Sequence, residues 1–156
     1  MKNILFINKL RGAFVAAAIG DALGWPNEYR SQIQSNKPFD SDGFATWTRK
    51  AGGRFYPHLE EIIAGEYSDD TQMIIAVSRS IILGKEKWNA HFTKIELPFW
   101  LEYERGGGRA TKMAAKIWKK KSFPWSDKNS LNSLRDYYNA GGNGAAMRVL
   151  PHVAKC

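Results

Sequence analysis

A chain of 156 residues with a formal net charge of +8 at pH 7, 44% hydrophobic residues and 24% charged residues has globular proportions, which excludes a disordered or low-complexity protein. Its length predicts one domain over residues 1–156, with enough residues to bury a core. The single cysteine, Cys156, excludes an intrachain disulfide and a cysteine-rich zinc site, and this favours a reducing, cytoplasmic setting.

The N-terminal residues lack the pattern of a targeting segment. The apolar run over residues 4–7 is interrupted by Asn8 and Lys9, and no small-residue cleavage site follows it cleanly. No stretch of about 18 apolar residues occurs, as a membrane span would require. We therefore expect neither a signal peptide nor an association with a membrane.

The excess of basic residues favours anionic partners, because clustered Lys and Arg raise the local concentration of phosphate-bearing ligands. The densest run is Lys119-Lys120-Lys121, with Trp118 and Trp125 nearby, so a nucleic-acid patch with stacking aromatic side chains is one interpretation. A solvated helix end is favoured, because cations are stabilised at helix C-termini. Nucleic acid is therefore not the expected partner.

Residues 9–22 predict the first helix, because apolar side chains recur at helical spacing on one face. Small residues line a neighbouring face and would permit close helix packing. The helix is expected to end near Gly24, because Pro26 disfavours helical angles in the residue before it. Glu28 is therefore expected on a loop.

Residues 31–65 contain scattered Gly and Pro without sustained periodicity, which predicts a long connecting segment with short helical turns. Within it, the stretches Trp47–Lys50 and Gly52–Phe55 interleave basic and aromatic side chains with glycines. A flap that faces phosphate or ribose would have this composition. A surface loop with its arginines extended along the protein fits equally well.

The block Tyr67-Ser68-Asp69-Asp70-Thr71 places two carboxylates and flanking hydroxyls directly before an apolar run at residues 73–77. The run has helical periodicity and ends at Gly84, so it predicts a core helix with the carboxylates at its N-terminus. Adjacent hard oxygen donors suit Mg²⁺ or Mn²⁺, and the positive end of the helix dipole stabilises their charge. A helix cap is the alternative, because Ser and Asp are favoured N-cap residues.

Aromatic residues between residues 88 and 104 predict a further packed helix, or a pair of turns, broken at Pro98. The side chains expected in its core face are Trp88, Phe92, Phe99 and Trp100. Next, Gly106-Gly107-Gly108-Arg109 precedes apolar residues with helical spacing over residues 110–118, which predicts a flexible turn and then a helix. The glycines do not form a P-loop, because the strand before it and the Lys-Ser/Thr pair after it are absent.

Residues 122–133 are rich in Ser, Asn and Asp and predict a loop, followed by a short amphipathic piece near Leu134 and Tyr138. Gly141-Gly142-Asn143-Gly144 then allows the backbone to approach a ligand closely, because Gly has no Cβ. Backbone N–H groups that lead into a helix can also bind an anion. No alternating strand pattern is evident, so the periodic segments and their Gly-rich connections predict an all-α fold.

Three blocks together resemble the ADP-ribosylglycohydrolase family in their residues, order and spacing. They are Gly20–Glu28, with Gly-Asp-Ala-Leu-Gly at its start, the Ser-Asp-Asp-Thr of Tyr67–Thr71, and Gly141–Arg148. The resemblance extends from about Arg11 to the last residue and covers only the N-terminal half of the family domain. It implies an ADP-ribosylglycohydrolase-like helical domain that is apparently truncated.

The resemblance also implies a reaction, namely Mg²⁺-dependent hydrolysis that removes ADP-ribose at the ribose anomeric carbon. Ser68, Asp69 and Asp70 match the N-terminal ligands of the family's binuclear metal site, with Mn²⁺ as a second candidate ion. Glu28 matches a carboxylate at the substrate, so Glu28, Asp69 and Asp70 are the implied catalytic residues. Asp21 is interpreted as supporting or structural. The implied substrate-binding residues are Gly141, Gly142, Asn143 and Gly144.

The family's second acidic cluster has no counterpart in this sequence, because no Asp pair follows Asp136. A complementary C-terminal chain, or self-association, would then supply the missing surface and ligands. The alternative function is an inactive ADP-ribose- or metal-binding regulatory protein, or one half of a split enzyme. The ADP-ribosylated target is not specified by the residues.

Overall fold

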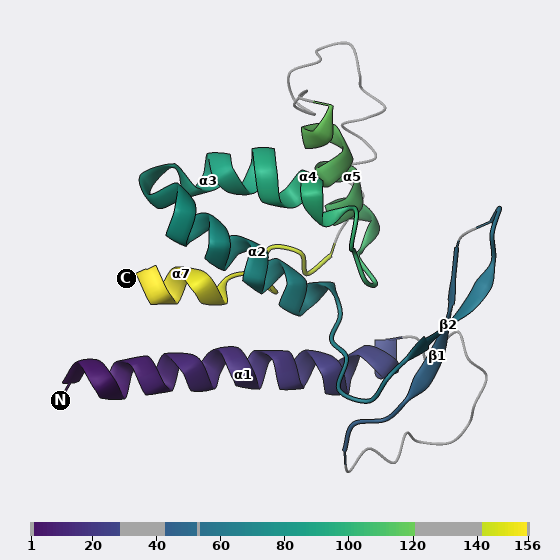
Figure 1. Cartoon of the computed structure of the whole chain (residues 1–156), viewed down its shortest axis with the longest axis horizontal. Coiled ribbons are helices and arrows are strands. Elements are labelled where there is room, and N and C mark those ends of the chain that lie inside the picture. The colour runs from purple at the N-terminus through teal and green to yellow at the C-terminus, as the bar shows by residue number, and fades with distance from the viewer. Residues whose placement is uncertain (1, 29–42, 53, 121–141, 156) are drawn as a thin grey trace. The chain divides into compact units, whose positions relative to one another are not determined.

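The computed structural model describes residues 2–28, 43–52, 54–120 and 142–155 of the chain, which belong to two compact units, Met1–Ser68 and Asp69–Cys156 (Figure 1). The loop predicted over residues 122–133, the amphipathic piece near Leu134 and Tyr138, and Gly141 lie outside the described residues. Each unit has its own elements and is described separately.

The first unit is built on one long helix, α1, which spans Lys2–Glu28. It extends beyond the predicted helix at both ends and continues through Gly24 and Pro26, so the predicted stop at Gly24 is wrong. Glu28 is consequently the last helical residue and not a loop residue. The close packing that the small residues of α1 would permit stays a prediction.

The C-terminal turn of α1 contains Pro26. Pro26 lacks the N–H that would bond to the carbonyl four residues earlier, at Ala22, so one bond of the ladder is lost. At the next residue, the side-chain amide of Asn27 donates to the carbonyl of Leu23 at 3.1 Å. This bond adds a side-chain contact in the same turn.

An antiparallel hairpin follows in the first unit, with strands β1 (Trp47–Ala51) and β2 (His58–Ile62). Trp47 pairs with Ile62 and Arg49 pairs with Glu60. The expectation of helical turns without strands is wrong here. The side chains of β1 alternate between half-buried and exposed positions, but Arg49 occupies one of the half-buried positions. A charged residue there breaks the alternation of apolar and polar residues by which a strand is identified in a sequence.

The inward face of β1 packs on the C-terminal turn of α1. Trp25 is 1% exposed, and its ring meets that of Trp47 edge-on with 5.3 Å between centroids. The guanidinium of Arg49 lies 5.2 Å from the Trp25 ring centroid and 2.7 Å from Glu60 Oε2. An arginine inside a strand is thus stabilised by an ion pair and an aromatic face. At the hairpin turn, Gly52 has φ of +81°, which favours glycine.

The second unit is a compact helical cluster. Its elements are α2 (Asp69–Gly84), the 3₁₀ turn η1 (Lys85–Lys87), α3 (Trp88–His91), the π-helical turn η2 (Phe92–Glu96), α4 (Leu97–Trp100), α5 (Arg109–Lys119) and α7 (Leu150–Lys155). Its core consists of Met73, Ala76, Val77, Phe92, Leu97, Trp100 and Ala115. The predicted helices at residues 70–84 and 110–118 are confirmed as α2 and α5.

The segment from Trp88 to Trp100 is more continuous than predicted. Pro98 lies in the first turn of α4, but helical structure runs without a gap from Trp88 to Trp100, so the predicted break at Pro98 is wrong. Phe92 and Trp100 are core residues as predicted, but Phe99 is 62% exposed, so its assignment to the core is wrong. Adjacent residues of a helix lie about 100° apart around its axis, so Phe99 points away from the face that buries Trp100.

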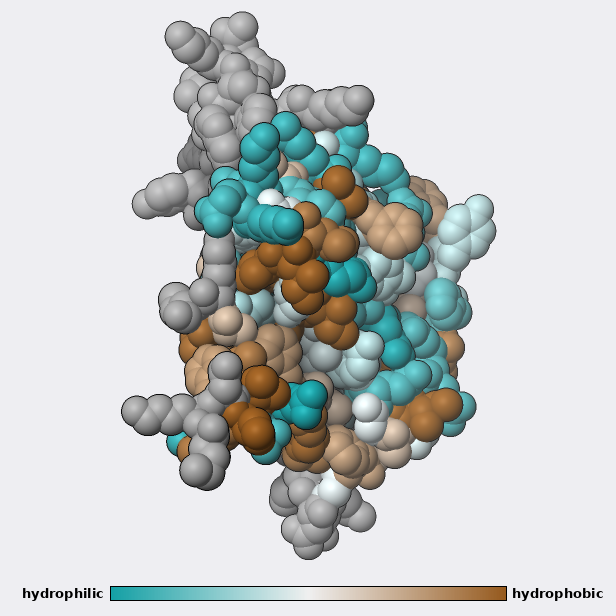
Figure 2. Space-filling view, turned by 60° about the vertical axis from the view of Figure 1, so that its left-hand side comes forward, coloured by the Kyte–Doolittle hydropathy of each residue, from teal (hydrophilic) through white to brown (hydrophobic). Residues whose placement is uncertain are grey.

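The all-α fold class is confirmed, with the small hairpin as its only sheet among the described residues. None of the helices that these residues form is long and apolar enough to cross a membrane. Large apolar side chains nevertheless remain on the surface, as the brown areas in Figure 2 show. They include Ile4, Leu5, Ile82, Leu83 and Val153.

Candidate functional site

The predicted placement of the carboxylate pair is confirmed. Asp69 and Asp70 form the first turn of α2, and Ser68 is the residue directly before it. Ser68 is 3% exposed and Asp69 is 8% exposed, so these polar groups are largely withdrawn from water. The apolar stripe that starts at Met73 anchors the helix in the core, and the positive end of the helix dipole faces its acidic first turn.

Asp21 reaches Ser68 from α1, although the two residues are 47 positions apart in the chain. The Ser68 hydroxyl donates to Asp21 Oδ1 at 2.5 Å. The Ser68 backbone N–H points at both carboxylate oxygens, at 3.2 Å from Oδ1 and 3.1 Å from Oδ2. One carboxylate thus holds both the side chain and the backbone of the residue that precedes the carboxylate pair.

Glu28, the third carboxylate of the predicted catalytic set, is exposed at the end of α1. Its backbone is helical, so its position is fixed by α1 and by the hydrogen bond of Asn27 rather than by a loop. The structure does not test its catalytic assignment. That assignment stays a prediction from the resemblance.

Sequence reasoning missed Gln72, which follows the carboxylate pair within the first turns of α2. Its side chain is 7% exposed. Gln72 Oε1 accepts from Trp100 Nε1 at 2.9 Å and from the Arg105 backbone N–H at 3.1 Å, while Nε2 donates to the Tyr103 carbonyl at 2.8 Å. The signal in the sequence was a lone amide beside the apolar stripe of a core helix, which must find partners when it is buried.

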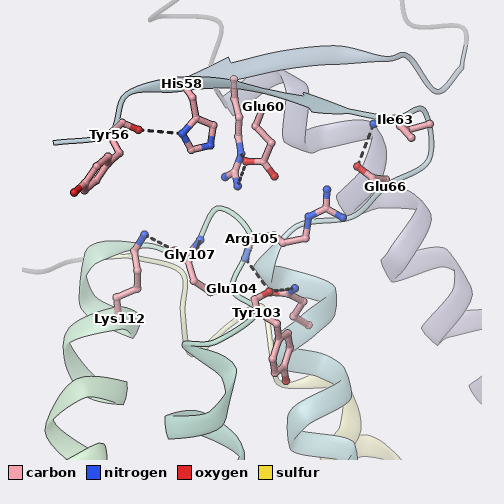
Figure 3. A network of polar contacts seen from close by, with 12 residues as sticks. Tyr56, His58, Glu60, Ile63, Glu66, Tyr103, Glu104, Arg105, Gly107 and Lys112 are labelled. Atoms are coloured by element: carbon pink, nitrogen blue, oxygen red, sulfur yellow. Dashed lines mark hydrogen bonds and ion pairs between the residues drawn. The ribbon is translucent and has the colours of Figure 1, made fainter. Parts of the chain in front are cut away.

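The contacts of Gln72 fix the loop that leads into α5, whose residues Tyr103, Glu104, Arg105 and Gly107 are labelled in Figure 3. Glu104 Oε2 accepts the Gly107 N–H at 2.9 Å, and Oε1 lies 3.1 Å from Lys112 Nζ. A Cβ at Gly107 would lie 2.4 Å from the Trp100 ring. The flexible turn that the glycines predicted is therefore a close-packed loop attached to the start of α2.

The described part of the predicted substrate segment lies in the second unit with α2 and α5. Gly142 and Asn143 are exposed, and the Asn143 carbonyl accepts the Met147 N–H at 3.0 Å. A Cβ at Gly144 would approach Thr111 Oγ1 to 3.0 Å, and Met147 packs against the core that contains Met73. The segment is thus seated on the same core as α2, while its role toward a substrate stays a prediction.

The donor chemistry of the block fits a hard divalent cation. Ser68, Asp69 and Asp70 offer a hydroxyl and two carboxylates from consecutive residues, and Mg²⁺ and Mn²⁺ prefer oxygen ligands. Within the described ranges, however, no three His, Cys, Asp or Glu side chains gather as a complete metal site would require. The block therefore fits such an ion chemically but supplies only part of a six-coordinate shell.

The interleaved aromatic and basic residues of the hairpin have a structural role. Arg49 is held by Glu60 and Trp25 in the first unit. In the same strand pair, the His58 ring nitrogen Nδ1 donates to the Tyr56 carbonyl at 3.0 Å (Figure 3). These contacts account for Arg49 and His58. Phe55 is 85% exposed, so the alternative that this segment faces phosphate or ribose stays a prediction.

Comparison with known proteins gives one match. The sequence model of the ADP-ribosylglycohydrolase family matches residues 2–156. No curated protein and no solved structure matches the chain. The family match spans the helix that carries Asp21, the start of α2 and the segment after residue 141, which are the three blocks on which the sequence resemblance rested. The chain belongs to the ADP-ribosylglycohydrolase family.

Proposed function

We propose that this chain contributes the N-terminal metal ligands and part of the substrate site to a Mg²⁺-dependent hydrolase that releases ADP-ribose. The observation that carries the proposal is the largely buried start of α2, where Ser68, Asp69 and Asp70 follow one another in a chain that belongs to this family. A surface helix cap would not need to withdraw these groups from water, because exposed caps are already effective.

Ser68, Asp69 and Asp70 would hold the cation, which is a pair of Mg²⁺ ions in the family, with Mn²⁺ as the alternative ion. When bound, the ions would supply positive charge that holds ribose hydroxyls and a water molecule at the reacting carbon. The helix dipole offsets part of the repulsion between the adjacent carboxylates Asp69 and Asp70.

The remaining roles belong to residues from the other two blocks. Glu28 would face the substrate and accept a proton from the attacking water on a carboxylate oxygen, as positive charge develops at the anomeric carbon. Gly141, Gly142, Asn143 and Gly144 would let the backbone approach the ADP-ribose closely. The tight fit of Gly144 against Thr111 supports a fixed conformation for the described part of this segment.

The three residues at the start of α2 supply only part of the ligands of a two-ion site. Two six-coordinate ions need more fixed ligands than Ser68, Asp69 and Asp70 supply, and ligands fixed by protein are what position the ribose and the water. A complementary chain that carries the family's C-terminal acidic residues would provide them. Self-association would cover exposed apolar side chains such as Ile82 and Leu83.

The test is an assay of ADP-ribose release in Mg²⁺ from the chain alone and from the chain mixed with the C-terminal half of a family member. The proposal predicts little or no turnover alone and restored turnover in the mixture, lost again with Asp70→Ala. Robust turnover by the monomeric chain alone, abolished by the same substitution, would show that no second polypeptide is needed.

A regulatory protein that binds ADP-ribose without hydrolysing it is the second candidate, and it needs only the partial ligand set that Ser68, Asp69 and Asp70 offer. Calorimetry with ADP-ribose separates the two functions. Binding of ADP-ribose by the mixture without any release from a modified substrate supports the regulatory function, whereas turnover excludes it.

A further inference from the structure

We infer that Asp21 is a positioning residue that turns the Ser68 hydroxyl into a fixed oxygen ligand for the metal ion. The inference deepens the proposed function and rests on it. Its basis lies wholly within the first unit, in three hydrogen bonds from one residue to one carboxylate, of 2.5, 3.1 and 3.2 Å.

The first step is the direction of the short hydrogen bond. A serine hydroxyl has one proton to donate and two lone pairs that can accept, and it rotates to suit its partners. An ionised carboxylate can only accept, so the contact between Ser68 Oγ and Asp21 Oδ1 must use the serine proton. With the proton directed at Asp21, the lone pairs of Oγ point elsewhere and are suited in orientation to a cation.

The second step is the strength of this restraint. Hydrogen bonds to an ionised acceptor are shorter and about twice as strong as those between neutral groups, and 2.5 Å lies at the short end of their range. The backbone N–H of Ser68 is held by the same carboxylate. With both its backbone and its hydroxyl restrained, Ser68 has little freedom to rotate its oxygen away.

The third step is the effect on a ligand. Partners that orient a metal ligand without touching the metal typically change its affinity about 10- to 100-fold when they are removed. Asp21 meets that description, because it contacts Ser68 but belongs to a different element, α1. The proposal also accounts for the aspartate in Gly20–Glu28 without giving it contact with the metal or the substrate.

A matched substitution follows from the chemistry. Asp21→Asn keeps the size and shape of the side chain, but its amide can donate a proton to Ser68 Oγ and so occupy a lone pair that a cation would need. Asp21→Glu keeps the acceptor-only carboxylate on a longer side chain. Asp21→Asn should therefore weaken the metal site more than Asp21→Glu does.

The experiment measures the Mn²⁺ dissociation constant by calorimetry for the parent chain, Asp21→Asn, Ser68→Ala and the double variant, in the mixture with a family C-terminal half where the chain alone binds too weakly. We expect Asp21→Asn to weaken binding about tenfold. In the Ser68→Ala background, where the hydroxyl is absent, the same substitution should change the constant less than about twofold, because its effect passes through that hydroxyl.

Thermal unfolding of each variant without metal separates positioning from folding. If Asp21→Asn lowers the midpoint enough to populate unfolded chain during the titration, all titrations are run at a lower temperature at which every variant is folded. A tenfold loss that persists without the Ser68 hydroxyl, or no loss in its presence, would overturn the role of Asp21 but leave the proposed function intact. Mn²⁺ binding that ignores both Asp69→Ala and Asp70→Ala would remove the proposed function and this inference together.

Discussion

Two polar networks flank the carboxylate pair in the sequence, and they differ in chemistry. Before the pair, the charged carboxylate of Asp21 holds Ser68. After it, the neutral amide of Gln72 holds Trp100 and the backbone of the loop into α5. A buried neutral amide that has its hydrogen-bond partners stabilises packing, whereas the Asp21 carboxylate, which holds the hydroxyl and the backbone N–H of Ser68, sets the direction of an oxygen donor. We therefore expect the first network to control a ligand and the second to control the fold.

The largest effect on activity is expected at the carboxylate pair, which lies between the two networks in the sequence. Asp70→Asn should lower ADP-ribose release by the reconstituted enzyme about 100-fold or more, because loss of a ligand should cost at least as much as loss of a partner that orients one. The free energy of unfolding should change little, since the amide still suits the start of a helix. Steady-state turnover and urea unfolding of the same preparation check both statements. Turnover within about threefold of the parent would contradict the assignment of Asp70.

The second network is broken by Gln72→Ala. The substitution leaves the Trp100 indole N–H and the Arg105 N–H without their acceptor, and a buried donor left unsatisfied costs about 1–3 kcal/mol. We expect the free energy of unfolding to fall by about 3 kcal/mol in urea titrations. Gln72→Met, which keeps the length of the side chain but removes its hydrogen bonds, is the matched control and should lose a similar amount. A fall under about 1 kcal/mol for the alanine variant would show that the amide does not hold the loop.

The ion pair between Arg79 and Glu96 in the second unit also tests the comparison. We expect this charged contact to stabilise the fold without affecting the metal ligands. Arg79 Nη2 lies 2.7 Å from Glu96 Oε2 and donates to the Tyr103 hydroxyl at 3.0 Å. Glu96→Gln should lower the free energy of unfolding by about 1–2 kcal/mol without changing Mn²⁺ affinity. If Glu96→Gln lowered Mn²⁺ affinity as much as Asp21→Asn does, the two networks would not differ in their effect on the metal.

The pH dependence of this pair follows from the arginine. The hydrogen bond to Glu96 raises the pKa of Arg79, partly offset by burial and aided by Tyr103. A raised folded-state pKa contributes stability at every pH below the unfolded pKa, and that stability is lost only as pH rises through the folded value. Ionisation of Arg79 should therefore add no slope to the unfolding free energy between pH 6 and 9. A loss of stability across that window in the parent that Arg79→Met removes would contradict this.

The smallest effect is expected at a surface pair. Lys119 Nζ lies 2.6 Å from Glu102 Oε1, with both side chains more than half exposed. Solvent screens such pairs, so Lys119→Ala should change the free energy of unfolding by less than about 0.5 kcal/mol. Thermal unfolding at low and at high salt measures it. A cost similar to that of Glu96→Gln would mean that exposure does not rank these contacts.

The parts of the fold that sequence patterns predicted are those with uninterrupted apolar periodicity. The stripe that begins at Met73 identified α2 and put Asp69 and Asp70 at its start, and the pattern after Gly108 identified α5. The hairpin escaped prediction because Arg49 occupies an inward position of β1, where a charged residue breaks the pattern. Its stabilisation by Glu60 and Trp25 depends on contacts between distant residues.

The same limit applies to the site. The carboxylate pair was readable because its residues are adjacent, whereas the contact of Asp21 with Ser68 joins residues 47 positions apart. The extension of α1 past Pro26 runs against the usual effect of proline inside a helix, so residue propensities did not predict it. Gln72 had a signal, as a lone amide beside an apolar stripe, but its three partners lie on α4 and on the loop that follows it.

Titration of Mn²⁺ into the parent chain, Asp69→Ala and Asp70→Ala, each in the mixture with a family C-terminal half, tests the central claim most directly. If the start of α2 is a metal site, the parent should bind Mn²⁺ and each alanine variant should bind at least about 100-fold more weakly. Thermal unfolding without metal should confirm that each variant is folded at the titration temperature. If both variants bind Mn²⁺ as tightly as the parent, Ser68, Asp69 and Asp70 form only a helix cap. That result would contradict the proposed metal-dependent hydrolase.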